Sequence, residues 1–353
     1  MKELVIGEWS VPVPVIQGGM GVGVSLDRLA GAVAKEGGIG VISTAQIGFL
    51  EDGYENNPLK TNLAAIRKVI ERARKIAKGG MIGANIMVAT KGYGEYVKAA
   101  VEAKVDLIIS GAGLPVDLPQ YVKNVKTKIA PIVSSEKAAK VILKLWDRKY
   151  QRVPDLVVIE GPEAGGHLGF SKKELCTITQ KSYAAEVKRI LSILEEYREK
   201  YQREIPVVVA GGVYDRKDME RVMALGVDGV QIATRFVTTE ECDATDAYKQ
   251  MYLQCKEEDI ILVESPVGLP GRAIRNSFLE EVKKFPEKFR TKKCRQCITG
   301  CNPAQTPYCI SQALIAAVNG NKKEGLFFCG KNAYRAERIE TVSDVMREFR
   351  GKH

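Results

Sequence analysis

Histidine is almost absent from this sequence. Only two of the 353 residues are histidine, His167 and the last residue, His353. Imidazole is the side chain whose ordinary pKa lies nearest neutral pH, so His167 is the one internal candidate for imidazole-based proton transfer. It lies in the glycine-rich segment 160–169, directly after the apolar run 155–159. We therefore expect a flexible loop to present this side chain at the end of a strand.

Long apolar runs are absent as well. No stretch of about eighteen consecutive apolar residues occurs, and residues 1–9 contain neither the apolar region nor the small-residue cleavage site of a signal peptide. The sequence therefore predicts a cytoplasmic protein with no membrane partner. In that compartment the eight cysteines are expected to be reduced thiols or metal ligands and not disulfides.

The charge balance is basic but diffuse. The chain has 53 Lys and Arg residues against 43 Asp and Glu residues, a net charge of +10. The densest basic stretch, residues 283–295, is short and contains Pro286, as a solvated connector would. We expect anionic small molecules or acidic carriers, and no nucleic acid, as partners.

Short apolar runs alternate with segments of helical periodicity. Each run is continuous in its apolar residues, as a parallel sheet covered on both faces requires. The expected strands are residues 13–17, 38–43, 81–88, 105–110, 129–134, 155–160, 205–210 and 228–233. The expected helices are 25–36, one that follows Asn57 and Pro58, 93–103, 135–146, 182–201, 215–225 and 243–255. Eight strands separated by helix-length connections predict an α/β protein with a closed TIM (β/α)8 barrel.

The alternation ends near Cys255. Residues 264–272 are expected to form an irregular loop, and helices are expected again at 310–318 and 342–349. We therefore predict two units. Residues 1–257 form a barrel, and residues 258–353 form a smaller C-terminal cap or tail that contains a cysteine cluster.

Glycines follow the expected strands where barrel enzymes carry their chemistry. Gly211 and Gly212 follow the seventh strand, and Gln231, Ala233 and Thr234 lie at the end of the eighth. Many barrels bind a phosphate between these two loops, where glycine amides and the start of a helix supply hydrogen-bond donors. We therefore expect a phosphate at this position, with the Thr234 hydroxyl as an additional donor.

The first and third strands end in further candidates. Gln17, Gly18, Gly19 and Met20 close the first strand, where a flat aromatic ring could lie over backbone without Cβ atoms, although composition alone favours a simple strand-end turn. Asn85 is an amide in an apolar strand, so it either fixes a neighbouring loop or contacts a polar edge of a ligand.

These segments together resemble a known family. They are residues 17–20, 34–42, 83–85, 160–169, 210–213 and 233–236, which occur in this order over roughly residues 12 to 240. They look like the FMN-dependent nitronate monooxygenases, formerly called 2-nitropropane dioxygenases. The closely related flavin-type enoyl-acyl-carrier-protein reductases share the same marks, so the resemblance does not separate the two activities.

The resemblance implies a role for each candidate residue. The flavin ring would be lined by Gln17, Gly18, Gly19 and Met20, and Asn85 would contact its polar edge. Glu160, Gly165 and Gly166 would lie near the ring and the ribityl chain. Gly211, Gly212, Ala233 and Thr234 would hold the phosphate, with Gln231 on the same strand end. Ala233 departs from the glycine expected before Thr234, a change that leaves phosphate binding plausible.

His167 matches the catalytic histidine of the family. In a nitronate monooxygenase it would lie near the nitro group, where it could attract the anion or take a carbon-bound proton, and dioxygen would carry the reaction to a carbonyl compound and nitrite. In an NAD(P)H-dependent enoyl thioester reductase it would position or protonate the substrate. From another class, the chain could be a flavin-binding electron-transfer or regulatory protein. A small-molecule substrate and a homodimer are further expectations.

Four cysteines have spacings that metal sites use. Cys294, Cys297, Cys301 and Cys309 are separated by two, three and seven residues. Thiolates so spaced can surround zinc or an iron–sulfur cluster. The first three resemble the cysteine run of cluster-bearing flavoenzymes of the old-yellow-enzyme type. The alternative is that reduced thiols pack the small C-terminal unit.

Overall fold

Eight parallel strands close into a barrel in the computed structural model, which describes residues 2–291 and 293–351. Around the barrel the order is β10-β11-β3-β4-β5-β6-β7-β8. The strands are β3 (Val15–Gln17), β4 (Ile39–Ser43), β5 (Met81–Met87), β6 (Leu107–Gly111), β7 (Lys128–Val133), β8 (Val157–Glu160), β10 (Val207–Ala210) and β11 (Gly229–Ile232). All eight lie within the predicted apolar runs or overlap them, so the TIM barrel prediction is confirmed.

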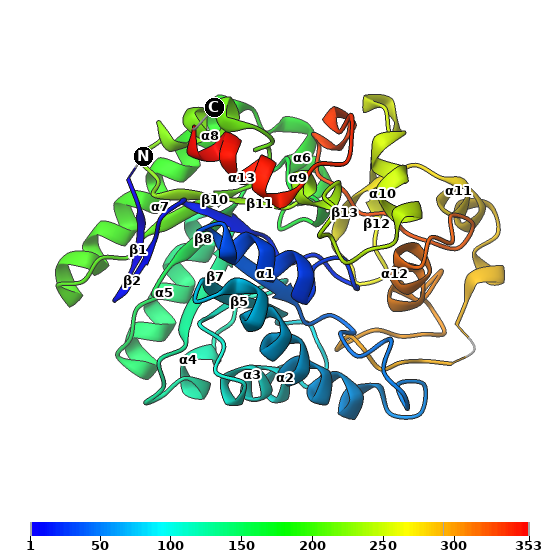
Figure 1. Cartoon of the computed structure of the whole chain (residues 1–353), viewed down its shortest axis with the longest axis horizontal. Coiled ribbons are helices and arrows are strands. Elements are labelled where there is room, and N and C mark those ends of the chain that lie inside the picture. Colours follow the sequence, from blue (N-terminus) through cyan, green and yellow to red (C-terminus); the bar gives the residue numbers. More distant parts are fainter. Residues whose placement is uncertain (1, 292, 352–353) are drawn as a thin grey trace.

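Helices surround the barrel in Figure 1. They are α1 (Asp27–Lys35), α2 (Pro58–Ala77), α3 (Tyr93–Glu102), α4 (Leu118–Tyr121), α5 (Glu136–Tyr150), α6 (Lys172–Thr177), α7 (Gln180–Tyr201), α8 (Arg216–Met223), α9 (Thr234–Val237) and α10 (Asp246–Leu253). The start of α2 shows how the sequence sets these boundaries. Asn57 accepts a hydrogen bond from the backbone N–H of Lys60, and Pro58 occupies the first turn, where its missing N–H costs nothing.

A short N-terminal hairpin closes one end of the barrel. It consists of β1 (Leu4–Ile6) and β2 (Trp9–Val11). Leu4, Ile6 and Val11 join one buried cluster with side chains from inside the barrel, such as Ile16 and Leu107. The barrel interior is therefore a packed core and not a pore, and the space for a ligand lies at the opposite end.

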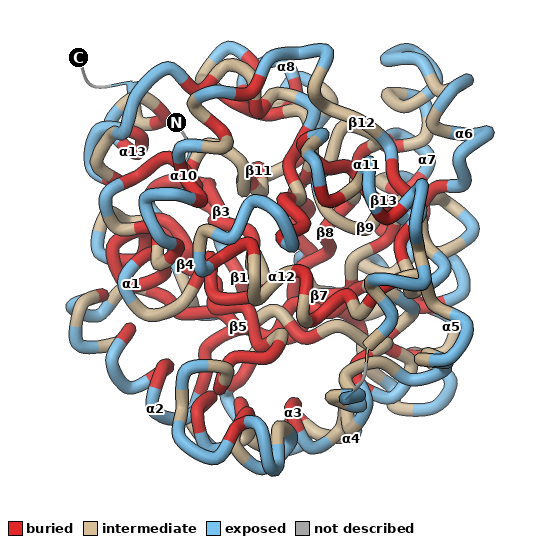
Figure 2. The backbone as a smooth tube through the Cα atoms, turned by 90° about the vertical axis from the view of Figure 1, so that its right-hand side faces the viewer, coloured by how far each residue is buried: buried red, intermediate tan, exposed pale blue. Residues whose placement is uncertain are grey.

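The C-terminal segment covers that opposite end. It contains β12 (Ile260–Glu264), β13 (Pro270–Ile274), α11 (Ser277–Lys284), α12 (Ile310–Val318), α13 (Val342–Arg350) and three short 3-10 helices at Glu257–Asp259, Pro286–Phe289 and Ala333–Arg335. Figure 2 views the molecule from this side, with buried backbone gathered around the strands and exposed backbone on the outer helices. Strands β12 and β13 form a hairpin, and β13 also pairs with β9 (Gly166–His167). The prediction of an irregular loop at 264–272 is therefore wrong at both boundaries. Only residues 265–269 form the turn between the two strands.

The last helix packs with the barrel. Val342, Val345, Met346 and Phe349 of α13 are buried in the main core cluster, together with residues of α1 and α8. Helix α13 thus completes the helical layer between α8 and α1, although it lies in the segment assigned to the smaller unit. The division at residue 257 stays a prediction. We propose that residues 258–341 form an insertion between β11 and the eighth barrel helix.

In the described part of the chain, no helix combines the length and the apolar character that crossing a membrane requires.

Candidate active site

A cavity of about 500 Å³ opens at the carboxyl ends of the barrel strands. It is lined by nearly all the residues that the sequence singles out, namely Gly18, Gly19, Met20, Asn85, Glu160, Gly165, Gly166, His167, Gly211, Gly212, Gln231, Ala233 and Thr234. This volume lies within the range of cofactor and small-ligand sites. Residues from all eight barrel strands or the loops after them line this one space, as the register of a parallel barrel dictates.

Gln17 is the exception. Its side chain is buried in the barrel wall, where its Oε1 accepts a hydrogen bond from the N–H of Val41 at 3.0 Å and its Nε2 donates to the carbonyl of Val41 at 3.2 Å. Gln17 does not line the cavity, so the expectation that its side chain contacts a flavin ring needs correction. A buried amide at a strand end finds backbone partners on the neighbouring strand, and here those partners use its oxygen and its nitrogen.

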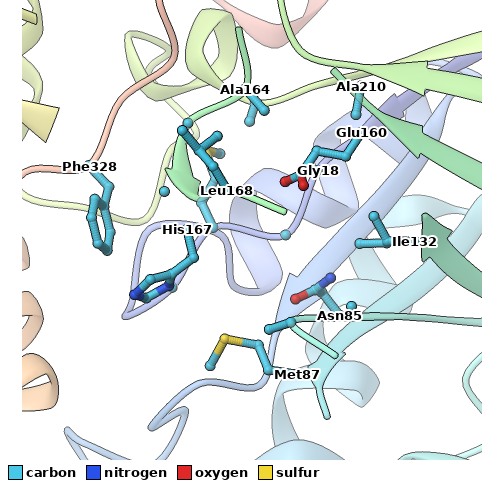
Figure 3. A pocket seen from close by; sticks show the side chains of 18 of the residues that line it. Gly18, Asn85, Met87, Ile132, Glu160, Ala164, His167, Leu168, Ala210 and Phe328 are labelled. Atoms are coloured by element: carbon cyan, nitrogen blue, oxygen red, sulfur yellow. The ribbon is translucent and has the colours of Figure 1, made fainter. Parts of the chain in front are cut away.

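Asn85 and Glu160 point into the cavity in Figure 3. The Asn85 side chain can lie against the backbone of Gly19 because Gly19 has no side chain. A Cβ at Gly19 would lie 2.4 Å from the Asn85 Cβ. The Glu160 carboxylate accepts a hydrogen bond from the N–H of Gly169 at 2.7 Å. Burial raises the pKa of Glu160 to about 7, against smaller lowering effects from that hydrogen bond and from Arg272. Glu160 is therefore a half-buried carboxyl whose pKa is raised toward neutral pH.

His167 lies at the mouth of the same cavity, in β9. Its Nε2 is 2.6 Å from the Ser265 Oγ, and its ring makes an edge contact with Phe328, with the ring centroids 4.9 Å apart. Burial lowers the pKa of His167 to about 4. At neutral pH the imidazole is therefore uncharged, and it acts through hydrogen bonds.

The predicted phosphate position has the backbone shape that the sequence indicates. Gly211 and Gly212 have φ angles of +93° and +79°, which side-chain-bearing residues rarely adopt, and Thr234 begins the short helix α9. An unpredicted segment lies over these residues: the N–H of Gly330 donates to the Thr234 Oγ1 at 2.9 Å, and the Asn332 Nδ2 donates to the carbonyl of Gly212 at 3.0 Å. Among the described residues, Lys331 is the one Lys or Arg side chain that lines the cavity, and it pairs with Glu163.

The residues that the sequence did not reveal come from the insertion. Ser265 and Phe328 contact His167, and the Arg272 side chain donates to the carbonyls of Pro162 and Ala164. A strand signal existed in the β-branched and apolar run 260–263, followed by turn residues up to Pro270. No local pattern, however, indicates which distant loop such a hairpin contacts.

The four clustered cysteines do not form a metal site. No group of three or more His, Cys, Asp or Glu side chains that could hold a metal ion occurs in residues 2–291 and 293–351. Cys294 is exposed, whereas Cys297 lines the cavity, and burial raises the pKa of its thiol to about 11. The prediction that Cys294, Cys297, Cys301 and Cys309 hold zinc or an iron–sulfur cluster is therefore wrong for this arrangement. All eight cysteines are free.

The fold and the cavity together define a class: a (β/α)8 barrel with a glycine-rich ligand site at the carboxyl ends of its strands. Residues 2–350 match the model of the nitronate monooxygenase family, so the chain belongs to that family and is an oxidoreductase. Membership supports a flavin as the cofactor and favours an enzyme over the regulatory alternative.

Individual relatives agree with this assignment. The chain is 24% identical over 310 residues to a probable nitronate monooxygenase of Staphylococcus saprophyticus, which covers 82% of this chain and 83% of that protein. Among solved structures, it is similar to FabK from Thermotoga maritima, with a TM-score of 0.72, 26% identity and coverage of 96% of this chain and 92% of that one. A nitroalkane oxidase from Streptomyces ansochromogenes gives a TM-score of 0.72 at 18% identity, over 97% and 95% of the two chains, which shows the shared fold alone.

Proposed function

We propose that this chain is an FMN-dependent oxidoreductase of the nitronate monooxygenase type, which converts nitronates or nitroalkanes with dioxygen into a carbonyl compound and nitrite. The observation that carries the proposal is the meeting of His167, Asn85 and Glu160 around one glycine-lined cavity. The substrate is a small molecule; the cytoplasmic location and the homodimer remain predictions.

The cavity suits FMN by an independent criterion. The Gln231 Oε1 is buried without a hydrogen-bond partner among the described residues, and Gln231 lines the cavity beside Gly18. A buried acceptor of this kind indicates that a donor belongs there. We propose that Gly18, Gly19, Met20, Asn85, Gly165 and Gly166 hold the flavin ring and ribityl chain, and that Gly211, Gly212, Ala233 and Thr234 hold the phosphate. When bound, a flavin would supply an electron acceptor for the substrate and a reductant for dioxygen.

The protein's own side chains bind and orient the substrate. The uncharged His167 imidazole offers a hydrogen bond to an oxygen of the nitro group, and the Asn85 amide offers a second polar contact. The insertion supplies an apolar wall from Val267, Leu269, Ile298, Ile310, Leu314 and Phe328, which excludes water from the mouth of the cavity.

The proposal is tested with purified protein and propyl-2-nitronate. We expect the absorption spectrum of an oxidised flavin, oxygen consumption and nitrite release. The His167→Ala variant should retain bound FMN and lose turnover by at least tenfold, because a hydrogen bond realised in the transition state is removed. His167→Asn keeps an N–H donor and serves as the matched control, with a smaller loss. Unchanged turnover in His167→Ala would remove this side chain from the reaction.

A second candidate is an NAD(P)H-dependent enoyl thioester reductase. The observation that favours it is the same apolar wall together with an uncharged imidazole, since both suit a neutral acyl chain. Rapid NAD(P)H consumption with a crotonyl thioester, and no oxygen uptake with propyl-2-nitronate, would decide for this reductase.

A further inference from the structure

We propose that Ser265 is a positioning residue that holds His167 in the tautomer with its proton on Nδ1, so that the imidazole presents an N–H donor to the substrate. The inference deepens the proposed function, because it specifies how the histidine of that site acts. It rests on Ser265, which lies in the segment 264–272 that the sequence predicted to be an irregular loop.

The hairpin that carries Ser265 is fixed against the histidine by backbone pairing. In the antiparallel register, Gly271 of β13 pairs with His167 and Arg272 pairs with Gly166. The N–H of Leu168 donates to the carbonyl of Pro270 at 2.9 Å, which extends this pairing by one bond. The tip of the hairpin is therefore placed beside the imidazole by main-chain contacts and not by a mobile side chain.

The turn itself holds Ser265 in place. The N–H of Ser265 donates to the carbonyl of Leu269 at 3.2 Å, and the N–H of Gly268 donates to the carbonyl of Ser265 at 3.0 Å. Ser265 is 8% exposed, so its hydroxyl has little access to bulk water. Its 2.6 Å separation from the Nε2 of His167 is thus a short contact between a buried hydroxyl and a half-buried imidazole.

Counting donors and acceptors assigns the direction of this hydrogen bond. A serine hydroxyl has one proton to donate and can accept from others. The N–H of Val267 donates to the Ser265 Oγ at 3.4 Å, which uses one of its two lone pairs and leaves the hydroxyl proton in need of an acceptor. Among the described residues, the Nε2 of His167 is the one acceptor in hydrogen-bond reach of the Ser265 hydroxyl. The hydroxyl therefore donates, and Nε2 must carry a lone pair.

An uncharged imidazole with a lone pair on Nε2 carries its proton on Nδ1. The Nδ1 has no hydrogen-bond partner among the described residues, and His167 lines the cavity. Phe328, which makes the edge contact with the His167 ring, has no side-chain acceptor for this proton. The side chain therefore donates to an oxygen of the substrate, such as an oxygen of the nitronate.

Nitrogen NMR of the histidine ring tests the assignment directly. The flavin-loaded protein is labelled with 15N-histidine and carries the His353→Gln change, so that His167 gives the single imidazole signal. We expect the Nδ1–H tautomer in this background and in Ser265→Thr, which keeps the hydroxyl. In Ser265→Ala we expect a shift toward the Nε2–H tautomer. An Nε2–H tautomer with Ser265 present, or a tautomer that does not respond to Ser265→Ala, would overturn the inference.

Kinetics provide a second measurement. Ser265→Ala should lower kcat for propyl-2-nitronate roughly tenfold with bound FMN retained, because the imidazole loses the hydrogen bond that fixes its tautomer. A factor of ten corresponds to about 1.4 kcal/mol of lost transition-state stabilisation. Ser265→Thr keeps the hydroxyl and should restore most of the loss. Ser192→Ala, on the exposed face of α7, is the control and should match the wild type. The two proposals fail separately: an Nδ1–H signal without nitronate turnover rejects the function alone, and nitronate turnover with an Nε2–H signal rejects the role of Ser265 alone.

Discussion

A carboxyl group that titrates near neutral pH lies inside the cavity. The folded-state pKa of Glu160 is about 7, above the ordinary value of 4.5, because burial disfavours its charged form. The folded protein therefore holds a proton that the unfolded chain releases between these two pH values. The contribution of Glu160 to stability is present below about pH 4.5 and is lost as the pH rises through about 7.

The Glu160→Gln variant tests this dependence. Glutamine cannot ionise, so the free energy of unfolding of the variant should fall less than that of the wild type between about pH 4.5 and 7. The expected difference is on the order of 3 kcal/mol, since one pKa unit corresponds to about 1.4 kcal/mol. Denaturant unfolding at several pH values measures it. If the free energy of unfolding changed with pH in the same way in both proteins, the pKa of Glu160 would have its ordinary value.

The residues of the cavity were predictable to different degrees. Gly211 and Gly212 could be found because positive φ angles restrict the position to glycine, and this restriction leaves a mark in the sequence. Gln17 could not be distinguished from the cavity residues next to it. The sequence of a strand end is the same whether its amide side chain faces a ligand or the backbone of Val41. His167 was found because it is rare, but its partner Ser265 is one serine among many.

The hairpin β12–β13 holds the histidine loop through one buried arginine. The guanidinium of Arg272 donates to the carbonyls of Pro162 and Ala164, at 2.9 Å for Pro162, and burial lowers the pKa of Arg272. These carbonyls lie in the loop between β8 and β9, which presents His167. Loss of the side chain leaves both acceptors without this donor.

We therefore expect Arg272→Ala to loosen the loop between β8 and β9. The unfolding free energy should fall by roughly 2 kcal/mol, because buried carbonyls lose charged hydrogen-bond donors, and FMN should bind more weakly. Thermal unfolding and a fluorescence titration with FMN measure the two effects. Arg67→Ala removes an exposed arginine that pairs with Glu71 and should change neither value appreciably. Equal behaviour of the two variants would show that Arg272 does not support the loop.

Strands and helices with strong periodicity were predictable, whereas β9 was not. The eight barrel strands are apolar on both faces, and α12 begins and ends at the residues that the sequence indicated. Strand β9 contains only Gly166 and His167, and it is a strand solely because β13 pairs with it. Such pairing depends on a distant segment, so no local pattern in residues 160–169 predicts it.

The two ends of the chain close the molecule in different ways. The N-terminal hairpin seals the barrel interior, and the C-terminal helix α13 fills the helical layer between α1 and α8. The cysteine-rich insertion therefore begins and ends on the barrel, and it lies over the cavity between those two attachments. A local sequence pattern predicts the amphipathic helix at 342–349, but it does not indicate the surface that the helix covers. The packing of α13 is consequently visible in the structure alone.

This packing predicts a large cost for a change close to the chain's end. Phe349 is 0% exposed and belongs to the main core cluster of the barrel, so Phe349→Ala should lower the free energy of unfolding by roughly 3–5 kcal/mol. Phe285 is 43% exposed, and Phe285→Ala is the matched control, with an expected loss well below that range. Denaturant unfolding followed by circular dichroism compares the two variants. If residues 342–350 instead belonged to a separate C-terminal unit, Phe349→Ala would leave the barrel's own unfolding transition in place, whereas the packing with α1 and α8 requires that the main transition shift.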